Sequence, residues 1–175
     1  MKFETDKLHI AVVGRANVGK SLLINCIFNL VPLQSNSISG DFTENFSREV
    51  ELLPKGSVVI IDFANIDDKT DFDKPIKDKT LKALLLANFA IIVLDARVEL
   101  NKSETDLITF LRKTEIPFLV AVNKIEFGTN PHLLSELDAL EVTYFELSCK
   151  ENAGIDNFRK KFIHMLPNEK ESRLQ

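Results

Sequence analysis

The chain has little of what disulfide frameworks and metal clusters require. It holds two cysteines among 175 residues, Cys26 and Cys149, and they lie far apart in sequence. Two such thiols form neither a disulfide framework nor a metal-ligand cluster, and they suit a reducing compartment. A chain of this length buries roughly 68–70% of the surface that it exposes when unfolded, so its core needs no covalent or metal staple. We therefore expect one domain over residues 1–167 and a frayed tail over 168–175.

The chain also lacks an excess of positive charge and a long apolar run. Its 22 Lys and Arg residues stand against 26 Asp and Glu, which gives a formal net charge of -4. This balance excludes a strong overall basic field, so we expect neither nucleic acid nor a membrane among the partners. The longest apolar run, 83–94, is interrupted by Asn88 and falls short of the about 20 residues that span a bilayer. Charges at the N-terminus also argue against a signal peptide, so the expected location is cytoplasmic.

What the chain does have is a regular alternation of short apolar runs and helical patterns. Apolar runs predict parallel strands at 8–13, 89–94, 116–122 and 142–147. Two further runs, at 50–53 and 58–62, are joined by the turn Pro54-Lys55-Gly56-Ser57, so one strand is antiparallel. Helices are expected at 22–30, 76–88, 103–113, 131–140 and 154–165, and loops at 31–46 and 63–75. This pattern predicts an α/β fold with a mostly parallel six-stranded sheet, one antiparallel strand and helices on both faces.

A glycine-rich segment follows the first predicted strand and matches the phosphate-loop pattern G-x-x-x-x-G-K-[ST]. Its members are Gly14, Arg15, Ala16, Asn17, Val18, Gly19, Lys20 and Ser21. Glycines let the backbone curl so that N–H groups point inward, and the following helix favours negative charge at its N-terminus. In such a loop Lys20 reaches the β- and γ-phosphates, and the Ser21 hydroxyl is a Mg²⁺ ligand. The strand before and the helix after are the context that this motif needs, so we expect a nucleotide-phosphate site here.

Two later groups specify the class of nucleotide. Asp62 ends an apolar strand, where a Walker-B type aspartate supports Mg²⁺ through water. Asn123 and Lys124 follow another strand, and a carboxylate comes two residues later at Glu126. Strand ends are where ligands bind in such sheets, and a carboxylate there accepts hydrogen bonds from the guanine N1–H and N2–H₂ groups. We expect Lys124 to cover the ring.

A third group follows the last predicted strand. Ser148, Cys149 and Lys150 could offer a backbone N–H to guanine O6. Each of these groups is a weak signal alone, but their order and their places at strand ends favour a guanine-nucleotide site.

At this point the chain resembles the translation-factor type of GTPase domain, which includes the TrmE/Era-like P-loop GTPases. Most closely it is similar to the GTPase domain of the hydrogenase maturation GTPase family, HydF. The matching segments are LHIAVVGRANVGKS, VELLPKGSVVIIDFANIDD, KDKTLKALL, IPFLVAVNKIE and SCK. This resemblance implies a Ras-like fold, GTP and GDP as ligands, Mg²⁺ as cofactor, hydrolysis of GTP to GDP, and hydrogenase maturation proteins as partners. Asn17 also resembles the residue that holds an activating K⁺ in some GTPases.

The sequence departs from the family pattern in three places. The pattern D-x-x-G ends here in Asn65, whose side chain would hinder contact with the γ-phosphate. The base motif N-K-x-D ends in Glu126, which is one methylene longer than aspartate. The first switch offers a lone threonine, Thr43, as a Mg²⁺ ligand. No glutamine follows the altered motif to orient water, so we expect slow and impaired hydrolysis, with catalysis resting on Lys20, Asp62 and the cations.

Three other functions stay open. The altered switch favours a nucleotide-bound interaction module that has lost hydrolysis. Another K⁺-type GTPase, acting in tRNA modification or ribosome assembly, is compatible with Asn17. An ATP-using P-loop enzyme would leave the Asn-Lys-x-Glu motif unexplained. The sequence does not indicate the oligomeric state.

Overall fold

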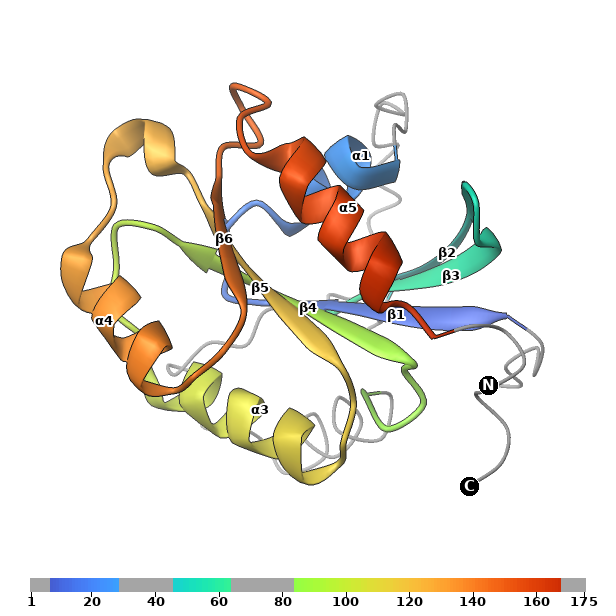
Figure 1. Ribbon diagram of the computed structural model, residues 1–175, viewed down its shortest axis with the longest axis horizontal. Coiled ribbons are helices and arrows are strands. Elements are labelled where there is room, and N and C mark those ends of the chain that lie inside the picture. The colour runs from blue at the N-terminus through green and yellow to red at the C-terminus, as the bar shows by residue number, and fades with distance from the viewer. Residues whose placement is uncertain (1–6, 29–45, 64–83, 168–175) are drawn as a thin grey trace.

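The computed structural model describes residues 7–28, 46–63 and 84–167 (Figure 1). Their elements are β1 (Leu8–Val13), α1 (Lys20–Phe28), β2 (Phe46–Leu52), β3 (Gly56–Asp62), β4 (Phe89–Asp95), α3 (Lys102–Lys113), β5 (Phe118–Asn123), the 3₁₀ turn η1 (Ile125–Phe127), α4 (Pro131–Ala139), β6 (Tyr144–Leu147) and α5 (Ile155–Met165). Among the described residues, none of the helices has the length and hydrophobicity of a membrane span.

The strands form one six-stranded sheet in the order β2-β3-β1-β4-β5-β6. The hairpin strands β2 and β3 pair antiparallel, and every other neighbouring pair is parallel. Every residue of β1 and β4 is buried, as expected for parallel strands that are covered on both faces. The predicted fold class is therefore confirmed, including the single antiparallel strand.

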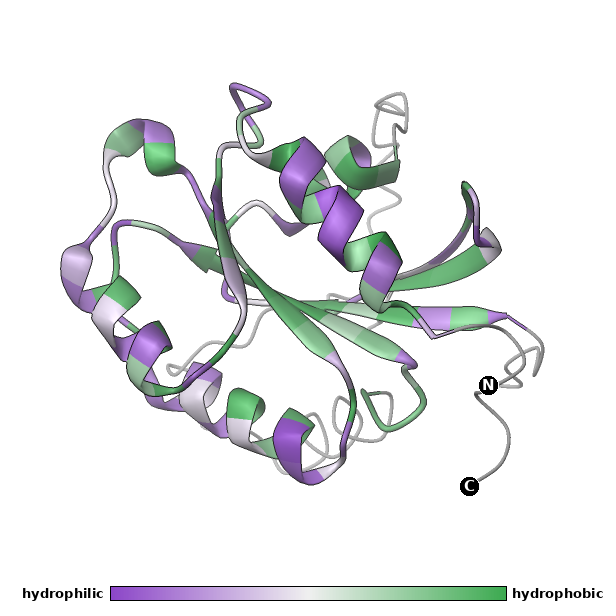
Figure 2. Cartoon of the chain, viewed as in Figure 1, coloured by the Kyte–Doolittle hydropathy of each residue, from purple (hydrophilic) through white to green (hydrophobic). Residues whose placement is uncertain are grey.

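Helices cover both faces of the sheet. One buried cluster joins the sheet to α1 and α5, and the other joins it to α3 and α4. In Figure 2 the strands are mostly hydrophobic, whereas the helices alternate hydrophobic and hydrophilic residues. Side chains of Val, Ile and Leu from alternating strand positions contribute to both clusters, because successive residues of a strand point to opposite faces of the sheet. The two clusters form an apolar layer on each face.

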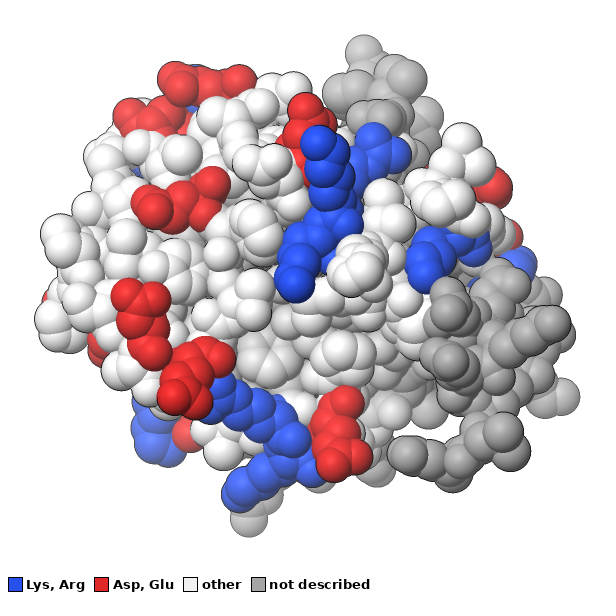
Figure 3. Space-filling view, in the orientation of Figure 1, with Lys and Arg blue, Asp and Glu red and all other residues white. Residues whose placement is uncertain are grey.

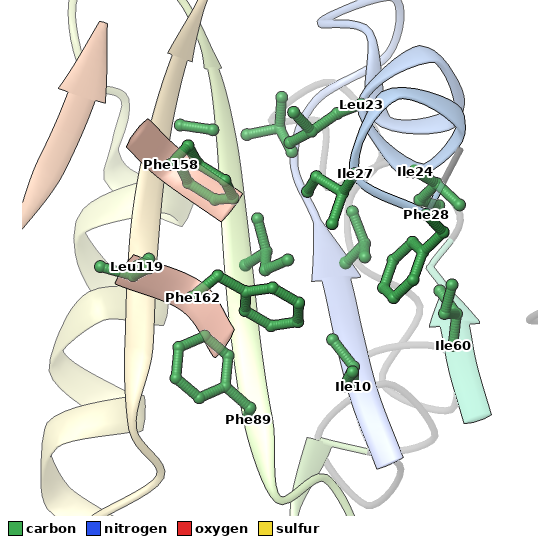
Figure 4. Packing of buried hydrophobic residues seen from close by; sticks show 14 of the residues in the cluster. Ile10, Leu23, Ile24, Ile27, Phe28, Ile60, Phe89, Leu119, Phe158 and Phe162 are labelled. Carbon is green, nitrogen blue, oxygen red and sulfur yellow. The ribbon is translucent and has the colours of Figure 1, made fainter. Parts of the chain in front are cut away.

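Aromatic rings fix α5 against the first layer (Figure 4). The Phe162 ring lies 5.3 Å from the Phe89 ring and 6.1 Å from the Phe28 ring, both in edge-on contacts. Edge-to-face geometry suits aromatic pairs, and all three side chains are buried. These contacts hold α1 and α5 together, and α1 begins at the phosphate loop. The core thus positions the phosphate loop, where the nucleotide site is expected.

Element bounds differ from the predicted ones by a few residues. The helix expected at 22–30 begins at Lys20, because the phosphate loop runs directly into it. The strand expected at 116–122 begins at Phe118, because Pro117 has no N–H to donate. The helix expected at 76–88 and both expected loops lie largely outside the described residues, and the tail 168–175 lies entirely outside them.

Candidate nucleotide-binding site

The phosphate loop joins β1 to α1 at the carboxyl edge of the parallel strands. A Cβ on Gly14 would lie 2.3 Å from the carbonyl oxygen of Val93, and one on Gly19 would lie 2.3 Å from Nδ2 of Asn123. Gly19 also has a φ of +103°, which disfavours other residues. Asn17 adopts left-handed geometry with φ of 60°, and its side chain is exposed. Both glycines are therefore required by close backbone and side-chain approach.

Lys20 lies across this loop. Its side chain is buried, and Nζ donates hydrogen bonds to the carbonyl oxygens of Gly14 at 3.0 Å and Arg15 at 2.9 Å. The ammonium group is thus held against the backbone of the loop. Phosphate binding by Lys20 stays a prediction.

Ser21 and Asp62 meet beside the loop although they belong to different elements. The Ser21 hydroxyl donates to Oδ2 of Asp62 over 3.3 Å. Burial raises the pKa of Asp62, and the nearby Lys20 and Ser21 oppose that shift. A hydroxyl and a carboxylate fit Mg²⁺, which prefers oxygen ligands and usually keeps several waters and substrate phosphates. The described ranges hold no group of three His, Cys, Asp or Glu side chains arranged for a metal.

The predicted residues of the two switch segments are not part of this geometry. Thr43, the expected additional Mg²⁺ ligand, and Asn65, the altered D-x-x-G position, lie outside the described residues. Their roles stay predictions.

Asn123 ties three loops together. Its side chain is buried, donates through Nδ2 to the Val18 carbonyl oxygen at 2.8 Å, and accepts from the Cys149 backbone N–H at 3.0 Å. The sequence places Asn123 among the nucleotide-binding residues, and in the structure its side chain links the phosphate loop to the segment after β6. Its contact with a nucleotide stays a prediction. The bond with Asn123 occupies the Cys149 N–H, so this group is not open toward guanine O6 in the structure.

Glu126 is the first acidic residue after β5 and lies in η1. Its Oε2 atom is buried and has no hydrogen-bond partner in the described part of the chain. Interaction with the Ser148 side chain is the largest cause that lowers the pKa of Glu126, and Lys150 and Lys124 contribute further. The residue is therefore an ionised carboxylate whose Oε2 atom accepts no hydrogen bond from the described residues, and such an atom calls for a donor.

Lys124 and Lys150 flank this carboxylate. Lys124 has left-handed geometry with φ of 74°, and its Nζ donates to the Asn17 carbonyl oxygen and, at 2.9 Å, to Oδ2 of Asp95. The Lys150 ammonium lies 5.2 Å from the centre of the exposed Phe127 ring. Lys124 therefore connects the base motif with the phosphate loop.

Arg15 differs from the other loop residues because its side chain turns toward α3. Its Nε donates to Oε1 of Glu104 at 2.8 Å, and its terminal nitrogen donates to the Glu99 carbonyl oxygen at 3.0 Å. Contact between Arg15 and a nucleotide would therefore use the backbone. Asp95 and Glu104 belong to none of the motifs recognised in the sequence. Asp95 ends a buried apolar strand as Asp62 does, and that shared pattern could have identified it.

The chain is similar in sequence to known GTPases. A family model described as "50S ribosome-binding GTPase" matches residues 9–124. GTPase Der of Trichodesmium erythraeum is 32% identical over 124 residues, which cover 67% of this chain and 26% of that protein. GTPase Der of Campylobacter jejuni is 25% identical over 170 residues, which cover 93% of this chain and 37% of that protein. The chain thus spans between about a quarter and two fifths of the length of these relatives.

Solved structures share the fold at lower identity. The GTP-binding protein engB superimposes with a TM-score of 0.72 at 21% identity, covering 90% of this chain and 98% of that one. Era bound to MgGDPNP and a segment of 16S ribosomal RNA gives a TM-score of 0.70 at 19% identity, covering 93% and 58%. The family model covers more than half of the chain, and its match includes the phosphate loop, Asp62 and the Asn-Lys pair. The chain belongs to the family of 50S ribosome-binding GTPases.

Proposed function

We propose that this chain binds GTP and GDP and hydrolyses GTP to GDP. The observation that carries the choice of guanine is the buried Oε2 atom of Glu126, which has no partner in the described residues. Guanine offers two donors, N1–H and N2–H₂, along one edge, whereas adenine presents an acceptor at N1 that a carboxylate repels. Lys124 and Lys150 both interact electrostatically with Glu126, and we expect Lys124 to cover the ring.

The phosphates would lie in the curled loop between Gly14 and Ser21. The N-terminus of α1 carries a partial positive charge, and the backbone N–H groups there have no intrahelical partner. Lys20 would exchange its two carbonyl acceptors for β- and γ-phosphate oxygens. That exchange needs no movement of the helix, because the lysine already lies over the loop.

Mg²⁺ would be held by the Ser21 hydroxyl, with Asp62 supporting its water ligands. When bound, this ion neutralises charge that develops between the β- and γ-phosphates. Lys20 adds a second positive charge on the same side. The chain's own contribution to hydrolysis is thus positioning and electrostatic stabilisation, and we expect slow turnover because of Asn65 and Glu126.

K⁺ activation is a finer proposal. Asn17 is exposed at the edge of the loop in left-handed geometry, with its backbone oxygen bound to Lys124. If its side chain holds K⁺, GTP hydrolysis should be faster in KCl than in NaCl at equal ionic strength. Asn17→Ala should abolish that difference, and equal rates in both salts would overturn the proposal.

The base assignment is tested by titration with GDP and ADP. Wild-type protein should bind GDP more tightly than ADP, and Glu126→Gln should reduce that preference because an amide both donates and accepts. Asp138→Asn, an exposed change in α4, serves as the matched control. Equal affinity for GDP and ADP in the wild-type protein would refute the assignment. Glu126→Asp should tighten GTP binding if the longer side chain displaces the carboxylate.

Hydrolysis needs its own test, because an interaction module that has lost hydrolysis would bind GTP as well as an active GTPase does. Phosphate release from GTP should exceed the rate without protein and should be lost in Lys20→Ala. Tight binding without release would favour the interaction module.

For the biological role, we propose assistance in assembling the hydrogenase di-iron centre in the cytoplasm. The support is the resemblance over "LLPKGSVVIID" and "ANIDD". A second candidate is a role at the ribosome, because the family description names ribosome-binding GTPases and the Era structure holds ribosomal RNA. Figure 3 shows basic side chains gathered where Figure 1 places α5, the helix that carries Arg159, Lys160 and Lys161.

Co-sedimentation separates the two roles. Binding to purified 50S subunits with a GTP analogue, lost on Lys160→Glu/Lys161→Glu, would support the ribosomal role. Complex formation with the proteins that build the di-iron centre, without subunit binding, would support the first.

A further inference from the structure

One connection in the fold contacts both halves of the candidate site. The segment 95–104 joins β4 to the first turn of α3. Asp95 at its start accepts from Lys124, and Glu104 at its end accepts from Arg15. Lys124 belongs to the base motif and Arg15 to the phosphate loop. A single segment thus holds one residue of each motif by a charged hydrogen bond.

These carboxylates are shielded from water. The Glu104 side chain is 1% exposed and that of Asp95 is 10% exposed. Arg97 first, and Lys124 second among the attractive partners, hold the pKa of Asp95 well below its usual range. Removing the cationic partner of a buried carboxylate leaves an uncompensated charge, which destabilises the protein. Neither carboxylate lies in the phosphate loop, at Asp62, in the Asn-Lys-x-Glu motif or in the Ser-Cys-Lys segment.

Each carboxylate acts on a residue that has a second bond inside the site. Lys124 also donates to the carbonyl oxygen of Asn17. The Arg15 carbonyl oxygen accepts from Lys20, the lysine that would bind phosphate. Glu104 is itself fixed, because it forms a capping box with Asn101 at the start of α3. The phosphate loop is therefore constrained by the start of α3, and the base motif is constrained by the end of β4.

We propose that Asp95 and Glu104 are separate positioning residues for the two halves of the nucleotide site. Asp95 orients Lys124 beside the Glu126 carboxylate, the group that would distinguish the two bases, and so supports discrimination between guanine and adenine. Glu104 orients the phosphate loop through Arg15 and so supports affinity for any nucleoside diphosphate. This inference rests on the proposed guanine-nucleotide function.

The two roles give opposite patterns in one binding experiment. Dissociation constants for GDP and, by competition, for ADP are measured with wild-type protein, Asp95→Asn and Glu104→Gln. Asp95→Asn should weaken GDP by about tenfold, as expected for a lost charge-assisted hydrogen bond, while ADP changes little. Glu104→Gln should weaken GDP and ADP by the same factor and leave their ratio unchanged.

The controls separate positioning from general damage. Asp106→Asn removes another carboxylate of α3, whose pair with Lys102 is exposed, and should change neither constant. Asp95→Glu keeps the charge and should restore part of the preference for GDP, which loss of stability alone would not do. Circular dichroism shows whether each variant is folded. If Asp95→Asn does not fold, the ratio of the GDP and ADP dissociation constants is compared between wild-type protein and Asp95→Glu.

The outcomes are distinct from a failure of the proposed function. A wild-type protein without preference for GDP over ADP would refute the guanine site itself. A wild-type protein with that preference, combined with an unchanged ratio in Asp95→Asn or an altered ratio in Glu104→Gln, would overturn the positioning roles alone.

Discussion

Lys20 holds two carbonyl oxygens of its own loop, and this arrangement shows how one residue prepares a site for anions. The ammonium is buried and hydrogen-bonded to these carbonyl oxygens. Phosphate oxygens are stronger acceptors than carbonyls because they are charged. We therefore expect Lys20 to donate to phosphate oxygens in place of the two carbonyl oxygens when a nucleotide binds.

Removing this charge should weaken nucleotide binding. Lys20→Ala is expected to lower the affinity for GDP at least about tenfold, or 1.4 kcal/mol. Titration with a fluorescent GDP analogue measures the change, and Lys161→Ala on the exposed face of α5 is the control. An unchanged affinity in Lys20→Ala would mean that the phosphates bind elsewhere.

Cys149 gives a second residue-scale prediction, which concerns pH. Burial raises the pKa of this thiol to about 12, and burial also raises the pKa of Cys26. Cys149 should therefore stay a neutral thiol at pH 8 and react slowly, because the thiolate is the nucleophile. The raised pKa also means that its contribution to stability is present below about pH 8.5 and is lost as the pH rises toward 12.

Cys26→Ser leaves Cys149 as the sole thiol, so its alkylation rate can be followed alone. The rate in folded protein at pH 8 should be at least about tenfold below the rate in denaturant. Equal rates would show that Cys149 is accessible and has an ordinary pKa.

Helix α3 illustrates the element scale, since its first turn is fixed by side chains. Asn101 accepts from the Glu104 N–H at 2.9 Å, and Glu104 accepts from the Asn101 N–H at 3.0 Å. Asn101→Ala should lower the free energy of unfolding by about 1 kcal/mol, because an N-cap bond is lost. Chemical denaturation measures this value. Asn101→Ser should recover most of it, and an equal loss in both variants would contradict the capping role.

The order of the elements could be predicted because the relevant signals are local. Apolar runs end at turn residues such as Gly14 and at the turn 54–57, which sets strands and the hairpin. The phosphate loop was recognisable for the same reason, as it occupies eight consecutive positions. In contrast, the bond between Arg15 and Glu104 joins residues 89 apart, and the bond between Asn123 and Val18 joins residues 105 apart. Such contacts follow from the packing of strands, which no local pattern encodes.

At the scale of the whole molecule, the site depends on the order of the strands in the sheet. The strand order places β1 between β3 and β4, with β5 beyond β4, so their carboxyl ends form one edge. The pairing of Asp95 with Asn123 across β4 and β5 sets the base motif beside the segment 95–104. Two apolar layers support this edge from both faces. Ligand binding at the loops should therefore be coupled to the stability of the entire domain.

This coupling gives a quantitative expectation for global unfolding. GDP with Mg²⁺ at about 100 times its dissociation constant should raise the free energy of unfolding by about 2.7 kcal/mol, provided that the unfolded chain does not bind it. Thermal unfolding monitored by circular dichroism should show a higher midpoint with GDP, and a smaller shift with ADP at equal concentration. Lys20→Ala should reduce the GDP shift, because mass action scales with affinity. A shift of equal size with both nucleotides would indicate that the phosphates alone supply the binding energy, and that the carboxylate of Glu126 does not contact the base.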